Sequence, residues 1–67
     1  MSLFKKTELT EKAANTHSVA RTAQRVHGFG SAEHRPYLQE AARAEREARD
    51  AGATWAELDA ARANYTN

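Results

Sequence analysis

The 67-residue sequence contains no cysteine and no isoleucine, and it has only one proline and three glycines. The absence of cysteine excludes disulfides, thiolate metal sites and thiol catalysis. Leucine, isoleucine, valine and phenylalanine together make only 8 of the 67 residues, a proportion typical of chains that fold with difficulty on their own. A domain of this size buries only about 60% of the surface that its unfolded chain exposes. Its stability is therefore marginal without a metal or a partner subunit.

No apolar run approaches the ~18 residues that a membrane span needs, and no secretory signal opens the chain. The net charge of +1 is typical neither of a strongly basic protein that binds nucleic acid nor of an acidic protein that mimics nucleic acid. We therefore expect a cytoplasmic protein that makes no membrane contact. The alanine- and arginine-rich composition is typical of an accessory protein from a high-GC bacterium, its phage or its plasmid.

The composition favours helix throughout and predicts an all-α fold, since 15 of the 27 apolar residues are alanine and only two are valine. We expect a long antiparallel helical hairpin over about residues 8–27 and 35–51, followed by a short third helix over about 55–64. Residues 1–6 are expected to form a flexible N-terminus. Residues 7–65 are expected to form a single small helical domain.

Capping signals place the ends of the hairpin helices. Thr7 or Thr10 is suited to be the N-cap of the first helix, which Gly28 would end in a left-handed conformation. Pro36 is best tolerated in the first turn of the second helix, where its missing N–H would be unpaired in any case. Between these helices, Phe29 stands between two glycines and is expected to plug the end of the core.

The most specific local signal lies at the start of the third helix. Thr54 and Glu57 form a capping box, in which each side chain accepts a hydrogen bond from the backbone N–H of the other. Gly52 ends the preceding helix. Trp55 is expected to be the main buried anchor of the third helix, and three more residues are available to face inward: Leu58, Ala61 and Tyr65.

Small side chains recur along both hairpin helices at alternating spacings of four and three, the period of a helix with one buried face. An alanine-lined face lets two helices approach closely but removes little apolar area from water. Pairing of two chains would enlarge the core, although a stable monomer whose alanines fill its own core remains the alternative. We call the following set the alanine seam and take it as the candidate self-association surface: Ala13, Ala20, Ala23, Ala41, Ala44 and Ala48.

Residues 47–58, EARDAGATWAEL, resemble the opening of helix-turn-helix DNA-binding motifs in small proteins of high-GC bacteria and phages. In that family a turn and a recognition helix follow. Because this chain stops at Asn67, the recognition helix is expected to be absent. Residues 15–21 also look like the start of a recognition helix, but the helical phase is unbroken from Leu9 to His27 and favours one continuous helix.

The chemistry-bearing residues form no catalytic pattern, since no serine has a base and an acid at motif spacing. His27, His34 and Glu33 lack the spacing that would put metal ligands on one helix face. We therefore expect a non-catalytic protein–protein interaction module without metal or cofactor, binding itself as a homodimer or another protein. The alternative is a small DNA-binding regulator, and the residues expected to contact nucleic acid or a partner are Lys5, Lys6, Lys12, Arg21, Arg25 and Phe29.

Overall fold

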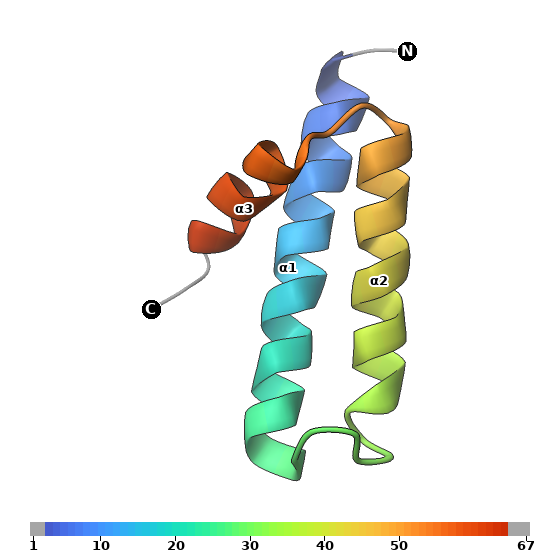
Figure 1. Ribbon diagram of the computed structural model, residues 1–67, viewed down its shortest axis with the longest axis vertical. Coiled ribbons are helices and arrows are strands. Elements are labelled where there is room, and N and C mark those ends of the chain that lie inside the picture. The colour runs from blue at the N-terminus through green and yellow to red at the C-terminus, as the bar shows by residue number, and fades with distance from the viewer. Residues whose placement is uncertain (1–2, 65–67) are drawn as a thin grey trace.

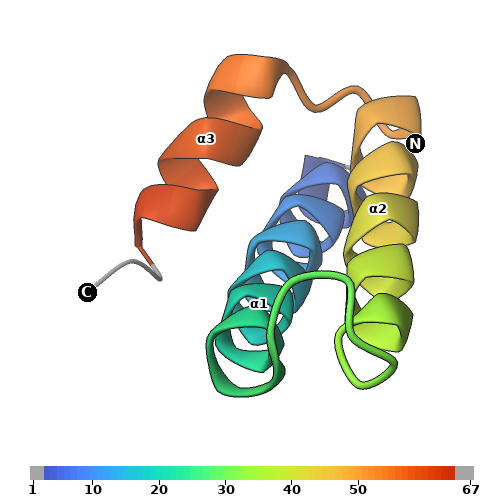
Figure 2. The same ribbon diagram turned by 60° about the horizontal axis from the view of Figure 1, so that its bottom comes forward.

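The computed structural model describes residues 3–64, with side chains from residue 5 onward, and it is all-helical over that part of the chain. Its helices are α1 (Leu3–His27), α2 (Arg35–Asp50) and α3 (Trp55–Ala63). Helices α1 and α2 form an antiparallel hairpin, and α3 packs mainly against the first half of α1 (Figures 1 and 2). Side chains of α3 also reach α2, as in the pair of Arg62 with Glu45. The predicted hairpin with a short third helix is confirmed. The hairpin half next to the glycine turn is left as a layer of two helices.

Helix α1 begins at Leu3, so the expected threonine N-cap is wrong, whereas the flexibility expected of residues 1–6 stays a prediction. Residues 3–6 are helical, whereas residues 1–2 lie outside the described part. Thr10 lies inside the helix, where its hydroxyl donates to the Lys6 carbonyl at 2.7 Å. Lys6 in turn forms an ion pair of 2.9 Å with Glu57 of α3, which fastens the first turns of α1 to a segment far away in the sequence. Residues 15–21 lie within α1, as one continuous helix requires.

The predicted helix ends are confirmed where glycine and threonine specify them. Gly28 and Gly52 follow α1 and α2 with φ of 96° and 105°, left-handed values that favour glycine. The Thr54 N–H donates to Glu57 Oε1 at 2.9 Å, and the Glu57 N–H donates to Thr54 Oγ1 at 3.1 Å, which completes the capping box. Pro36 lies in the first turn of α2, as expected.

The core consists mainly of alanines. All six residues of the alanine seam are buried, and so are Ala14 and Ala53. Leu58 of α3, which is 1% exposed, is the one large apolar side chain among the described buried residues. Because the hairpin helices cover the seam themselves, its proposed use as a surface between copies is wrong for the intact hairpin. The alternative in which the alanines fill the core of their own chain is the one that the structure adopts.

Two aromatic residues expected to be buried are exposed instead. Phe29 projects from the glycine turn and is 77% exposed, so it does not plug the core. Trp55 is 51% exposed, and its ring lies under the Arg49 guanidinium at 4.3 Å rather than between helices. Leu58 takes the buried position instead, where it packs in one cluster with alanines of α1 and α2. Tyr65 lies outside the described residues.

Candidate interaction surfaces

Ion pairs between helices hold α3 against the hairpin. Besides the pair of Lys6 with Glu57, Arg62 of α3 pairs with Glu45 of α2. A further pair joins the two hairpin helices, with Lys12 of α1 and Glu47 of α2 at 3.9 Å. The hydrogen bond from Lys6, together with that from the Thr54 N–H, lowers the pKa of Glu57 to about 2. Acidic and basic groups at this end are therefore largely matched with one another.

The residues expected to contact nucleic acid do not form one surface. Lys5 and Arg25 are separated by about 30 Å along α1, at 1.5 Å per residue. Lys12 and Arg21 are nine residues apart, which at about 100° per residue places them on opposite sides of the helix. Lys6 and Lys12 are already engaged by carboxylates of other helices. The structure thus divides the set between the two ends of the hairpin and does not assemble a continuous basic stripe.

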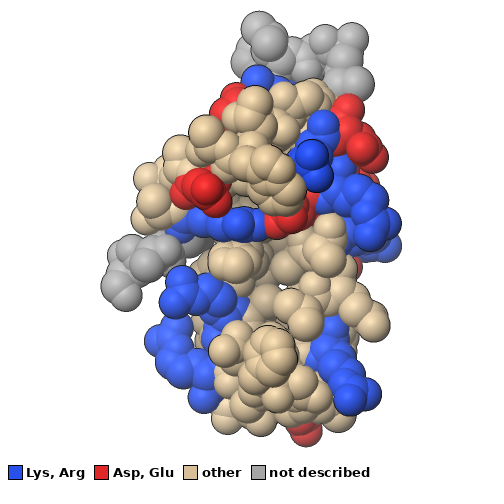
Figure 3. Space-filling model, viewed as in Figure 1, with Lys and Arg blue, Asp and Glu red and all other residues tan. Residues whose placement is uncertain are grey.

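The arginines near the glycine turn differ from the lysines because no ion-pair partner is present for them among the described residues. Arg21 and Arg25 of α1 and Arg35 of α2 are all exposed. In Figure 3, Lys and Arg side chains border both edges of the surface below α3, with other residues between them and an acidic residue at the lower tip. Partial burial, followed by the positive charges of Arg62 and Arg21, lowers the pKa of His17 from its usual 6.5 despite the nearby Glu45.

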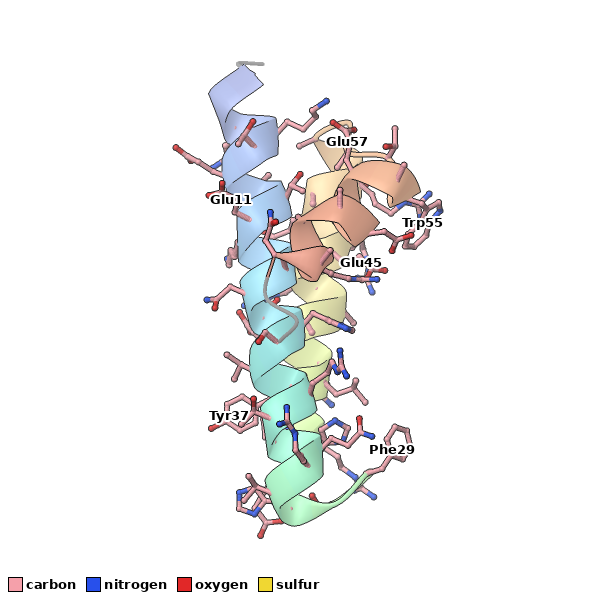
Figure 4. All side chains as sticks on the ribbon, turned by 90° about the vertical axis from the view of Figure 1, so that its left-hand side faces the viewer. Glu11, Phe29, Tyr37, Glu45, Trp55 and Glu57 are labelled. Atoms are coloured by element: carbon pink, nitrogen blue, oxygen red, sulfur yellow. The ribbon has the colours of Figure 1, made fainter. Side chains whose placement is uncertain are left out.

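The turn half of the hairpin also exposes most of the large apolar side chains of the described chain, on two opposite sides. Figure 4 shows Tyr37 on one side, and Phe29 on the other side together with Trp55 and Glu45. Val19, Val26 and Leu38 are exposed as well, and all the large apolar residues of this half lie between 41% and 77% exposed. Exposed apolar side chains that gather on one face mark binding surfaces, whereas scattered ones need no explanation.

On the side of Tyr37, an open groove of about 300 Å³ runs along α1 and reaches Tyr37 of α2. Of the described residues that line it, none is lysine, arginine, aspartate or glutamate. We name this surface the valine face and define it by its lining residues: Ser18, Val19, Thr22, Ala23, Val26, His27 and Tyr37.

The valine face follows a helical repeat that is visible in the sequence. Asn15, Val19, Thr22 and Val26 recur at spacings of four, three and four, the same period as the alanine seam. Val19 and Val26 lie next to the alanine seam in the helical repeat, yet the structure leaves both of them exposed. Valine loses side-chain freedom in a helix and is a weaker helix former than alanine. Both valines of the chain therefore occupy positions where the folded monomer gains little from them.

His34 is the buried polar residue that the sequence did not indicate. It is 1% exposed, and its Nδ1 accepts a hydrogen bond of 3.1 Å from the Gly30 N–H. The Phe29 ring packs against the imidazole with 5.4 Å between ring centroids. His34 thus holds the glycine turn in place and supports the base of the Phe29 side chain. Within residues 3–64 there is no cluster of three side chains suited to bind a metal ion.

Comparisons with protein-family models, with curated proteins and with solved structures returned no match for this chain. The resemblance of residues 47–58 to a helix-turn-helix opening therefore stays a prediction. In the structure these residues form the last turn of α2, the connection and the first turn of α3. None of the helices in the described part is long and apolar enough to cross a membrane.

Proposed function

We propose that this chain is a non-catalytic protein–protein interaction module that pairs with a second copy of itself through the valine face. The observation that supports the proposal is the uncharged, largely apolar groove that Val19, Val26 and Tyr37 leave open on the turn half of the hairpin. The alanine-rich core supplies a second reason. Burying an alanine removes little more than one methyl group from water, at about 0.8 kcal/mol per carbon, so the monomer has little apolar burial to stabilise it.

A second copy fits this face better than a charged partner does. In a two-fold symmetric pair each residue of the interface meets the same surface of the other chain, so a charge near the axis would face its own kind. The valine face avoids this repulsion because its lining contains no lysine, arginine, aspartate or glutamate. A standard interface takes about 800 Å² from each partner. That area is about one sixth of the 4788 Å² accessible surface of this chain, so one side of the hairpin is enough.

The test is light scattering coupled to size exclusion over a dilution series, with a charge placed on the groove. The chain has a mass of 7.4 kDa, so a pair has twice that mass, 14.8 kDa. We expect the parent protein to approach the mass of the pair at micromolar concentration and to dissociate on dilution. Val26→Lys should shift it to the monomer, because an ammonium group would be desolvated at the interface while it is solvated in the monomer.

Gln39→Lys is the matched control. Gln39 is exposed on α2 outside the groove, so the same new charge should leave the dilution curve unchanged. Circular dichroism of both variants confirms that the helical fold is retained. A parent protein that stays at 7.4 kDa at the highest concentration, or a Val26→Lys variant that pairs as well as Gln39→Lys, would contradict the proposal.

A further inference from the structure

The side of the hairpin opposite the valine face carries a second surface with different chemistry. It lies on the same side as α3 but beyond the end of that helix, next to the glycine turn. Its apolar residues are Phe29 and Leu38, which are 77% and 45% exposed. We name it the arginine-flanked face and define it by these two residues and by three arginines: Arg21, Arg25 and Arg35.

Helical register places these residues on one side. Leu38 lies seven residues before Glu45, which pairs with Arg62 of α3, so Leu38 continues the side of α2 that α3 approaches. Arg35 lies fourteen residues before Arg49, whose guanidinium covers the Trp55 ring of α3.

The helix α1 supplies the other edge of the face. Arg21 follows His17 by one turn and so lies on the same side of α1. Burial, and then the charges of Arg62 of α3 and of Arg21, lower the pKa of His17, as expected for a residue on the side of α1 that faces α3. Arg25 is one further turn along α1, towards the glycine turn. In Figure 4, Phe29 projects to the side on which Trp55 and Glu45 lie.

The charges of this face are unbalanced. No ion pair engages any of its three arginines among the described residues, whereas Glu33 is the one carboxylate between residues 12 and 39. Arginine side chains on both edges of an apolar strip form a surface that is complementary to apolar side chains bordered by carboxylates. In Figure 3, Lys and Arg side chains lie on the left and right of a strip of residues that carry no charge of the Lys, Arg, Asp or Glu type.

Helix α3 shows how a helix lies on this side of the hairpin. It buries Leu58 between α1 and α2, and acid–base pairs on its flanks join Glu57 to Lys6 and Arg62 to Glu45. The helix ends at Ala63, and the side of the hairpin that it covers continues beyond it to Leu38 and the glycine turn. A helix docked there would extend the same packing mode.

We propose that the arginine-flanked face binds an amphipathic helix of a partner protein, with apolar side chains on Phe29 and Leu38 and acidic side chains beside Arg21, Arg25 and Arg35. Such a partner presents apolar residues at spacings of three and four, as helices that bind in grooves do. This inference is independent of pairing through the valine face, which lies on the opposite side. The partner and a second copy can therefore be bound at the same time.

The test uses synthetic helical peptides and amide shifts measured by nuclear magnetic resonance. The first peptide has about four turns, with leucine at spacings of three and four and glutamate on both flanks. A second peptide replaces the glutamates by lysine, and a third replaces the leucines by glutamine. We expect the first peptide alone to bind, and to shift the amide signals of residues 21–38.

Charge reversal then locates the binding site. The double variant Arg21→Glu with Arg25→Glu should weaken binding of the acidic peptide about tenfold or more, because two favourable pairs become repulsive. Arg46→Glu is the control. It makes the same kind of change at an exposed arginine of α2 that lies about 16 Å along the helix from Arg35, at 1.5 Å per residue.

Three results would overturn the inference. The first is that the acidic leucine peptide shifts no signal of residues 21–38. The second is that the lysine peptide or the glutamine peptide binds equally well. The third is that a duplex DNA oligonucleotide binds with a steep salt dependence that the Arg21→Glu and Arg25→Glu double variant abolishes, while the acidic peptide does not bind. That result would assign the face to nucleic acid.

Discussion

Replacing Leu58 by alanine should destabilise this protein more than replacing Trp55, although tryptophan is the larger side chain. Leu58 is 1% exposed and packs in one cluster with Ala13, Ala44 and Ala48. Leu58→Ala removes three carbons, worth about 2.4 kcal/mol at ~0.8 kcal/mol each, and leaves a cavity that adds to the loss. The expected cost is about 2–5 kcal/mol.

Trp55 stacks on a guanidinium at the surface, an arrangement worth about 0.5–1 kcal/mol at exposed sites. With the packing of its buried half, Trp55→Ala should cost about 1–2 kcal/mol. A chain of 67 residues has a total stability of roughly 3–10 kcal/mol. Loss of Leu58 therefore removes a large part of the stability, whereas loss of Trp55 does not.

Urea denaturation measures both effects. Circular dichroism reports all three helices, and the fluorescence of Trp55, the only tryptophan of the chain, reports the packing of α3. Because Leu58 belongs to the same buried cluster as residues of α1 and α2, both signals of Leu58→Ala should shift together to lower urea. A Leu58→Ala variant as stable as the parent, or a larger loss for Trp55→Ala, would refute the assignment of the α3 anchor.

Three further substitutions test the cap, the alanine seam and a titrating group. Thr54→Ala should cost about 1 kcal/mol in urea denaturation while Thr54→Asp is tolerated, and equal stability of both with the parent would contradict the capping box. Ala44→Leu should cost about 1–3 kcal/mol through overpacking, whereas leucine at the exposed Ala60 should be neutral; equal melting of the two variants would show that the seam is loosely packed. Burial, and then two arginines, lower the pKa of His17, so on acidification His17 binds a proton in the unfolded chain before it does so in the folded chain. The free energy of unfolding should therefore fall as the pH drops below about 6.5. A His17→Asn variant should lose part of this pH dependence, and a variant with the same pH profile as the parent would contradict the role of His17.

Local chemistry accounts for what the sequence predicted correctly. Glycine at a left-handed position and a threonine capping box act within a few residues, so Gly28, Gly52 and Thr54 place helix ends without knowledge of the tertiary structure. The spacing of alanines likewise identified the buried faces of α1 and α2, because a helix has a fixed period.

The incorrect expectations depend on contacts between distant segments. The first turns of α1 contact α3 through the ion pair of Lys6 with Glu57, residues 51 positions apart, which no local pattern indicates. The exposure of Trp55 depends on where the short connection places α3, and no local pattern specifies that position. Its size and its position directly after the cap favoured Trp55 as the anchor, whereas Leu58 is the side chain that packs among the alanines.

The valine face was predictable in part: its pattern is local, but its exposure depends on the tertiary structure. The repeat of Asn15, Val19, Thr22 and Val26 is visible in the sequence, but a periodic pattern does not say whether an apolar stripe packs within the chain or outside it. Helix α2 occupies the neighbouring alanine stripe, and α3 lies on another side of α1, so the outer stripe stays uncovered. That assignment required the positions of all three helices.

Disulfide cross-linking of a Thr22→Cys variant is the sharpest test of pairing through the valine face. The chain has no cysteine of its own, and Thr22 lies midway along the stripe between Val19 and Val26. In a two-fold pair this position faces its counterpart near the axis, within reach of a disulfide, which needs Cα atoms about 4.4–6.8 Å apart. We expect rapid oxidation of Thr22→Cys to a covalent pair at micromolar concentration and slow oxidation of Gln39→Cys. Equal rates for the two variants would contradict this pairing.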